Sequence, residues 1–306
     1  MKEIEKRMIR KEFSDSVDKN LFQLKNVKAK KFLAVFDGLR FSKSTLEYAI
    51  QLTKDVNAFL TGIFLDEFIY HYDVSPIPAS YKDVEKLFSQ QAEKDKEMRD
   101  ESVREFERAC SQANIHYSFH RSTGIYIREV KQESIFADLM IINANETFTM
   151  FAENPPAHFI KELLTDVQCP VLVTPGKFRP IDKITLLYDG KPSSVFAIKM
   201  FSYLFGDLSG MPVEVFTVNE PMEGSHLPNN KLMREFIKRH FPKAKYVVEK
   251  GNAEEQILGH LRYHKGNELV VLGAYRRSEI SRWFKTSMAD ILMKELDTPL
   301  FIAHNK

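Results

Sequence analysis

Apolar runs alternate with amphipathic stretches along most of this chain, and one series of landmarks occurs twice. An apolar run ending in Asp-Gly is followed by an amphipathic stretch, then by another apolar run, and finally by a proline-led strand. These landmarks begin at residues 32, 137 and 170 in the first half and at 184, 267 and 299 in the second. Recurrence in the same order indicates a duplicated domain, and the period is too long for a solenoid.

Within each half the pattern predicts five strands separated by helices. The strands are apolar throughout, which is typical of a parallel sheet covered on both faces. Ser44-x-x-Glu47 has the spacing of a capping box at a helix start. We therefore predict an α/β fold with two tandem doubly wound five-stranded parallel-sheet domains, packed as a pseudo-dimer through their closing strands at 171–173 and 300–303. The other strands are expected at 32–36, 60–65, 116–119, 139–142, 184–188, 213–218, 245–248 and 269–272.

The domain boundaries follow from the landmarks and from a linker that contains proline and glycine at 174–180. We expect domain 1 over 30–176, with a charged helical insert over about 81–112, and domain 2 over 180–306. An aromatic cluster around Tyr70 precedes the insert. Three interpretations of it stay open: a lid, a surface for a partner, or a loop packed onto the domain. Residues 1–29 lie outside the duplication, and the sequence is compatible with either a docking helix or a frayed tail there. Their apolar residues fall roughly on one helical face: Ile4, Met8, Phe13, Val17, Leu21 and Leu24.

Composition narrows the function classes. Of 306 residues, 43% are hydrophobic and 28% charged, which is typical of a globular protein. A net charge of +2 argues against nucleic acid or a membrane as the main partner. The only cysteines, Cys110 and Cys169, form neither a disulfide framework nor a zinc site. With no apolar signal core or membrane span in the sequence, we expect a cytoplasmic protein.

The ordered landmarks make the chain similar to the universal stress protein family, within a larger superfamily of adenine-nucleotide-binding α/β proteins. The resemblance covers about 30–176 and 180–306. It implies that the acidic residue after the first strand approaches adenine. It also implies that a loop G-x2-G-x9-G-[S/T] after the fourth strand holds ribose and phosphates through main-chain amides.

In the second half this loop maps onto Gly273, Arg276, Thr286 and Ser287, so that only the first glycine and the hydroxyl residue remain. With Asp189, the residues Gly273, Arg276 and Ser287 form the candidate nucleotide site, where Arg276 could pair with a phosphate.

In the first half the corresponding positions are Asn143, Glu146 and approximately Ala157 and His158, which keep none of the loop chemistry. Glu146 would place a negative charge near phosphate. Both Asp37 and Asp189 can also be explained by ordinary Asp-Gly turn chemistry.

The remaining groups of polar and aromatic residues give weaker indications of function. Basic residues surround Trp283 in the second loop, but we interpret this segment as surface or interface. His260 and His264 are four apart on a predicted helix, without metal-site companions, and are expected to be solvated. No catalytic motif occurs, so no catalytic residue and no metal ligand is assigned.

Two functions remain open. The first is a non-enzymatic universal stress protein that acts in the stress response by binding a small anionic ligand or a protein partner, with a degenerate nucleotide loop in both halves and no assigned cofactor. The alternative is an ATP-binding member, with slow hydrolysis, that holds ATP or another adenine nucleotide in domain 2. The pseudo-dimer is expected within the chain, and association into a further homodimer stays open.

Overall fold

The computed structural model describes residues 29–65, 81–122, 126–148, 153–206, 210–222, 224–264, 266–274 and 287–304. The docking helix expected over 1–29 and the aromatic cluster around Tyr70 lie outside these ranges, apart from residue 29. The first half contains β1 (Lys31–Asp37), α2 (Lys43–Val56), β2 (Phe59–Leu65), α3 (Tyr81–Gln112), β3 (His116–Ser122), α4 (Tyr126–Ser134), β4 (Leu139–Asn143), α5 (His158–Asp166) and β5 (Val171–Thr174). The second half contains β6 (Lys183–Leu187), α6 (Pro192–Phe205), β7 (Val213–Asn219), α7 (Asn230–His240), β8 (Lys245–Lys250), α8 (Ala253–Tyr263), β9 (Glu268–Gly273), α9 (Met288–Glu295) and β10 (Leu300–Ala303).

All ten of these strands belong to one continuous sheet, in the order β3-β2-β1-β4-β5-β10-β9-β6-β7-β8. Within each half the neighbouring strands are parallel, as predicted. The halves meet where β5 and β10 pair antiparallel, with Leu172 opposite Phe301. This pairing confirms the pseudo-dimer and its predicted seam, and it satisfies two strand edges that would otherwise be open.

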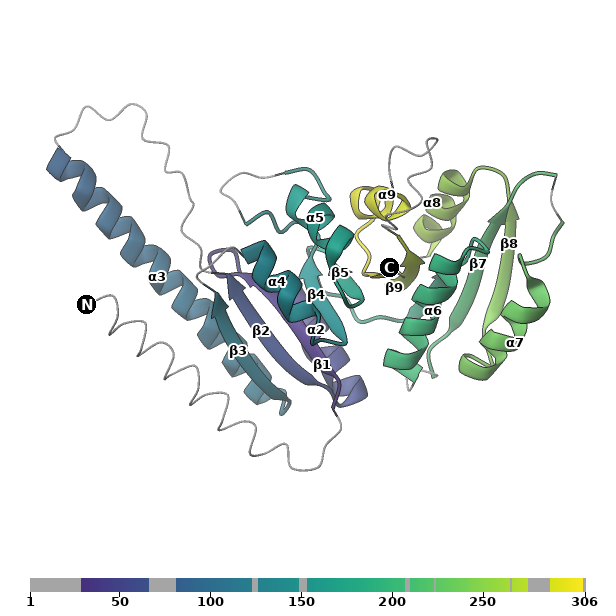
Figure 1. Cartoon of the computed structure of the whole chain (residues 1–306), viewed down its shortest axis with the longest axis horizontal. Coiled ribbons are helices and arrows are strands. Elements are labelled where there is room, and N and C mark those ends of the chain that lie inside the picture. The colour runs from purple at the N-terminus through teal and green to yellow at the C-terminus, as the bar shows by residue number, and fades with distance from the viewer. Residues whose placement is uncertain are drawn as a thin grey trace.

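Helices cover both faces of the sheet, and side-chain alternation along the strands divides the core into two layers (Figure 1). Helices α2, α3, α6 and α7 cover one face, where Phe32, Phe201 and Phe301 are fully buried. Helices α4, α5, α8 and α9 cover the other, around residues such as Val35 and Leu163. Among the helices in the described ranges, none is both long enough and apolar enough to cross a membrane.

Helix α3 has the bounds expected for the insert and is much longer than its counterpart α7, so that one end extends well past the strands (Figure 1). Its C-terminal part packs on the sheet at Gly62, where an added Cβ would come within 2.9 Å of the Phe106 ring. Ser102 also donates a hydrogen bond of 2.7 Å to the carbonyl of Gly38. The insert is therefore anchored at the end of β1, next to the position where the resemblance places adenine.

The predicted capping box at Ser44 is wrong. Helix α2 is capped by Ser42, whose Oγ accepts a hydrogen bond from the Thr45 amide at 3.2 Å. Ser44 lies inside the helix and donates at 2.7 Å to the carbonyl of Pro175, 131 residues away. The Ser44 hydroxyl, which the local pattern assigned to capping, is therefore used in a tertiary hydrogen bond to the linker.

Candidate functional site

In each half the strand order reverses direction beside the first strand, between β1 and β4 and between β6 and β9. Ligands of open α/β sheets bind outside the carboxyl ends of the strands at such switch points. Asp37 and Asn143 lie there in the first half, and Asp189 and Gly273 lie there in the second. These candidate residues therefore lie at the edge of the sheet where ligands of open α/β folds bind.

Asp189 organises the turn that leads into α6. Its Oδ1 accepts hydrogen bonds from the Lys191 amide at 3.0 Å and from Ser194 Oγ at 2.6 Å. The residue is exposed. These contacts are turn chemistry of the Asx type, which the sequence analysis kept open beside a role in binding adenine.

Gly273 allows helix and sheet to come close together. A Cβ at this position would lie 2.4 Å from the Ser193 carbonyl oxygen and 2.8 Å from the Ser194 amide nitrogen. The glycine therefore lies against the main chain at the start of α6. This packing role accounts for the glycine without any phosphate, in contrast to the role that the resemblance implies.

Ser287 is the N-cap of α9, but its side chain makes no capping hydrogen bond. Its main-chain carbonyl accepts from the Ile291 amide at 3.2 Å. The start of a helix favours anions, because free amides and the helix dipole face them. The other assigned loop residue, Arg276, lies outside the described residues, as do Thr286 and Trp283.

The switch point of the first half contains two buried carboxyl groups. Asp37 accepts a hydrogen bond from the Leu39 amide at 2.9 Å, and burial raises the pKa of its carboxyl group. Burial, followed by the nearby charge of Asp37, raises the pKa of Glu146 well above its ordinary range. A phosphate here would have to approach two buried carboxyl groups whose ionised forms are already unfavourable.

The side chain of Asn143 takes the position of the first loop glycine and is fully engaged within the protein. Its Nδ2 donates to Ser42 Oγ at 3.2 Å and to the Pro175 carbonyl at 3.1 Å. Its Oδ1 accepts from the Asn145 amide at 2.9 Å. The residue thus fastens the start of the linker to α2.

The start of α5 is the first-half counterpart of the start of α9. The N-cap of α5 is Ala157, so Ala157 rather than His158 stands in the place of Ser287. The approximate mapping was one residue off at this point. A carboxylate oxygen of Glu153 accepts a hydrogen bond from the His158 amide at 2.7 Å. The anion position of this helix is therefore filled by the chain's own glutamate.

His260 and His264 are partly exposed, and each is also hydrogen-bonded to a carboxylate. His260 is hydrogen-bonded to Glu214 and stacks on the Phe216 ring with centroids 4.3 Å apart. His264 Nε2 lies 3.0 Å from Asp182 Oδ1. Their partners are distant in sequence, so helical spacing gave no signal for these contacts.

His260 belongs to an ionic cluster that the sequence analysis missed, at the opposite ends of the strands from the candidate site. Lys183 Nζ lies 2.9 Å from Glu214 and 3.2 Å from Glu268. Burial alone would raise the pKa of Glu214, but hydrogen bonds from His260 and Lys183 outweigh it and lower the pKa to about 2. Thr185 Oγ1 also donates to Glu268 at 2.6 Å.

The first half has a related cluster, because Lys31 begins β1 as Lys183 begins β6. Lys31 Nζ lies 3.0 Å from Glu133, and His120 Nδ1 lies 3.1 Å from the same carboxylate. The hydrogen bond with His120 is the largest of the effects that lower the pKa of Glu133 to about 2. In the part of the chain that the structure describes, no group of three or more His, Cys, Asp and Glu residues could hold a metal ion.

Comparison with known proteins supports the resemblance. No family model matches the chain. A universal stress protein of Synechocystis is 24% identical over 168 residues, which cover 53% of this chain and 56% of that protein. The chain therefore matches about half the length of this curated relative.

Solved structures share the fold over both halves. A universal stress protein from Archaeoglobus fulgidus has a TM-score of 0.63 at 14% identity, covering 90% of this chain and 96% of the other. A protein of unknown function from Pseudomonas aeruginosa has a TM-score of 0.54 at 13% identity, covering 90% and 92%. The match in sequence and the doubled fold together make this chain similar to universal stress proteins, with the shared fold present twice in one chain.

Proposed function

We propose that this protein is a non-enzymatic universal stress protein that acts in the stress response by binding a small anionic ligand or a protein partner, and that its first half holds no nucleotide. The observation that carries the proposal is the contact between Glu153 and the start of α5. A family nucleotide would place its phosphate against this helix start. Here a carboxylate of the chain is already bound there, at 2.7 Å from the His158 amide.

Electrostatics supports the same conclusion for the first half. A phosphate at this helix would have to displace the Glu153 carboxylate and then lie near it. The buried Glu146 places an acidic side chain where the family loop has a glycine, and the nearby charge of Asp37 adds to the effect of burial in raising its pKa. Charge-assisted hydrogen bonds are worth about 1.5–3 kcal/mol each. Losing two of them lowers affinity by about a hundredfold or more.

One observation favours the alternative, in which the second half binds ATP or another adenine nucleotide and hydrolyses it slowly. The hydroxyl of Ser287 makes no capping hydrogen bond at the start of α9. A serine in that position can donate to a phosphate oxygen while the helix start supplies amides. Asp189 is exposed at the switch point of the second half, where the resemblance places the adenine.

The test is calorimetric titration of the purified protein with ATP, ADP and inorganic phosphate, combined with a phosphate-release assay. Ser287→Ala removes the hydroxyl and keeps a small residue at the N-cap. Substitutions of Gly273 do not serve as a binding test, because any added Cβ would collide with the main chain at the start of α6. Glu153→Gln is the matched variant in the first half and should create no new site.

The outcomes separate the two functions. Absence of binding up to about millimolar nucleotide, with no phosphate release, refutes the ATP-binding alternative. ATP binding in the low micromolar range that Ser287→Ala weakens by about tenfold or more supports the alternative and refutes the prediction that the nucleotide loop is degenerate in both halves. Sustained release of phosphate from ATP would contradict the non-enzymatic assignment.

A further inference from the structure

Positive charge is concentrated around α7 in the second half. Residues 230–250 contain seven lysine and arginine residues against two glutamates, a net charge of +5, whereas the whole chain has a net charge of +2. Helix α3, which holds the place of α7 in the first half, contains nine acidic and seven basic residues. The charge is therefore a property of this one segment, because the duplicated fold position does not require it.

Most of the cations on α7 and just after it are available to a partner. Lys231, Lys238 and Lys243 are exposed and make no salt bridge to another residue in the part of the chain that the structure describes. Arg239 lies 2.8 Å from Glu235, but both side chains are more than half exposed, so this pair contributes little and can open. We call Lys231, Lys238, Arg239 and Lys243 the basic surface.

Helix α7 directs these cations away from the core. Met233 and Ile237 are buried against the sheet. Lys231 and Lys238 are seven positions apart, which is about two helical turns, so both project from the outward side of the helix. The helix itself lies at the outer end of the second half, beside the edge strand β8 (Figure 1).

A row of apolar and aromatic side chains runs beside the basic surface toward α6. The centroids of the Phe236 and His240 rings are 4.6 Å apart, and the His240 ring is 5.9 Å from that of Tyr203 on α6. Leu232 continues this apolar row, because it precedes Phe236 by four residues on the same side of α7. Leu232 is 68% exposed and Tyr203 is 55% exposed. Aromatic and arginine side chains are enriched in protein interfaces.

We propose that the basic surface, together with the apolar row, is a docking site for an acidic segment of a partner protein in which carboxylates alternate with apolar side chains. The carboxylates pair with Lys231, Lys238 and Arg239, and the apolar side chains cover Leu232 and Tyr203. This deepens the proposed function, on which it rests for the existence of a protein partner. It shares no residue with the candidate nucleotide site.

The surroundings of the basic surface favour a protein segment over a nucleic acid. The 11 residues of α7 span only about 16 Å, which is short for the continuous basic track of a nucleic-acid-binding protein. Glu235 and Glu249 interrupt the basic segment and would repel a uniformly charged phosphate backbone. An exposed leucine such as Leu232 also has no partner on a phosphate, whereas an apolar side chain of a peptide can cover it.

The test measures binding to the full chain by the fluorescence anisotropy of a fluorescein-labelled synthetic peptide, in which glutamates separate leucines at every third or fourth position. One control peptide has glutamine in place of leucine, and a labelled oligothymidylate represents nucleic acid. The informative variant combines Lys231→Glu with Lys238→Glu. The matched control combines Lys54→Glu with Lys161→Glu, because these first-half lysines are also exposed and without a salt bridge among the described residues.

We expect the double substitution on α7 to weaken peptide binding by about tenfold or more, and the matched control to bind like the parent protein. Leu232→Ser should weaken binding about threefold, whereas Met222→Ser, at a position that is 97% exposed, should not change it. The glutamine peptide should bind more weakly than the leucine peptide.

Four results would overturn the proposal. They are no peptide binding at all, equal losses in the α7 variant and the matched control, oligothymidylate binding as tight as that of the peptide, and dimers of the parent protein in sedimentation that the α7 variant does not form. The last two would assign the basic surface to a nucleic acid or to a second copy of the chain. None of them bears on the nucleotide titration, so this proposal and the nucleotide assignment fail separately.

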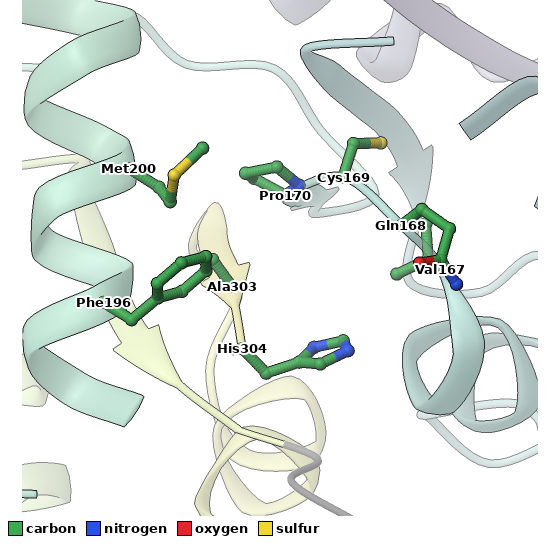
Figure 2. A pocket seen from close by; sticks show the side chains of 8 residues that line it. All are labelled: Val167, Gln168, Cys169, Pro170, Phe196, Met200, Ala303 and His304. Atoms are coloured by element: carbon green, nitrogen blue, oxygen red, sulfur yellow. The ribbon is translucent and has the colours of Figure 1, made fainter. Parts of the chain in front are cut away.

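A cross-link locates the bound peptide on the protein. Both native thiols are buried, and burial raises the pKa of Cys110 and of Cys169 to about 12, so neither competes for a maleimide. Figure 2 shows Cys169 in the lining of a cavity of about 170 Å³ at the seam. Glu235→Cys carrying a benzophenone maleimide should cross-link to the peptide, and Lys161→Cys should not. Cross-links from Lys161→Cys, or from neither position, would overturn the placement on α7.

Discussion

The ionic cluster at the start of β6 makes a quantitative prediction about acid stability. Glu214 is nearly buried, with 11% of its side chain exposed, and its pKa is about 2 instead of the ordinary 4.5. Each unit of difference between the two pKa values is worth about 1.4 kcal/mol, so the paired carboxylate contributes ~3 kcal/mol to the free energy of unfolding. Because its pKa is lowered in the folded state, this stability is present above pH 4.5 and is lost as the pH falls toward about 2.

The perturbation is Glu214→Gln, which keeps the size of the side chain and removes its charge. We expect urea unfolding at pH 7 to show a loss of ~3 kcal/mol relative to the parent protein. The difference should shrink as both proteins are measured at successively lower pH below about 4.5. Glu249→Gln, at an exposed position on β8, is the control and should change stability by less than about 0.5 kcal/mol.

Two results would refute this reasoning. A loss smaller than about 1 kcal/mol at pH 7 would mean that the contacts with Lys183 and His260 are no stronger than those of exposed ion pairs. A loss that stays constant between pH 7 and pH 3 would mean that it does not come from the carboxylate charge. The parent protein should still lose stability in this range, because the pKa of Glu133 is also about 2.

Three further predictions concern the two switch points and the seam. Gly273→Ala should lower the free energy of unfolding by about 1–3 kcal/mol without ligand, because its Cβ would collide with the α6 main chain. Gly259→Ala, which has open space for its Cβ, is the control and should be neutral or stabilising in thermal unfolding. Glu146→Gln should raise the melting temperature, with a gain that widens from pH 5 to pH 8, because the raised pKa makes the charged carboxylate unfavourable in the folded state. Asn267→Ala should cost about 1–3 kcal/mol by leaving Tyr48 Oη and the Arg179 carbonyl without this donor, and an unchanged denaturation midpoint would contradict it.

The sequence predicts the sheet well because strand signals are local and occur twice. The apolar runs and their bounding turns identify the strands, and duplication makes the closing strands of the halves natural partners. The observed pairing of Leu172 with Phe301 lies within the predicted seam. Local hydrophobic pattern is sufficient for this level of structure, because burial of a strand is decided largely by its own residues.

The polar contacts, at the candidate site and at the opposite ends of the strands, were less predictable because they join residues distant in sequence. Ser44 contacts the linker and leaves capping to Ser42. His260 on α8 is hydrogen-bonded to Glu214 on β7, 46 residues away. Gly273 is explained by the start of α6, which lies some 80 positions earlier in the chain. No local spacing rule contains these partners, so a glycine or histidine motif alone could not reveal them.

The antiparallel contact between β5 and β10 also affects how this molecule can vary. In an assembly of two identical chains, one mutation would alter both sides of such a contact together. Here Leu172 and Phe301 are separate codons of one gene, and either can change while the other compensates. The same independence extends to the loops, so that one half can carry a glutamate such as Glu153 at a helix start while the other carries Ser287.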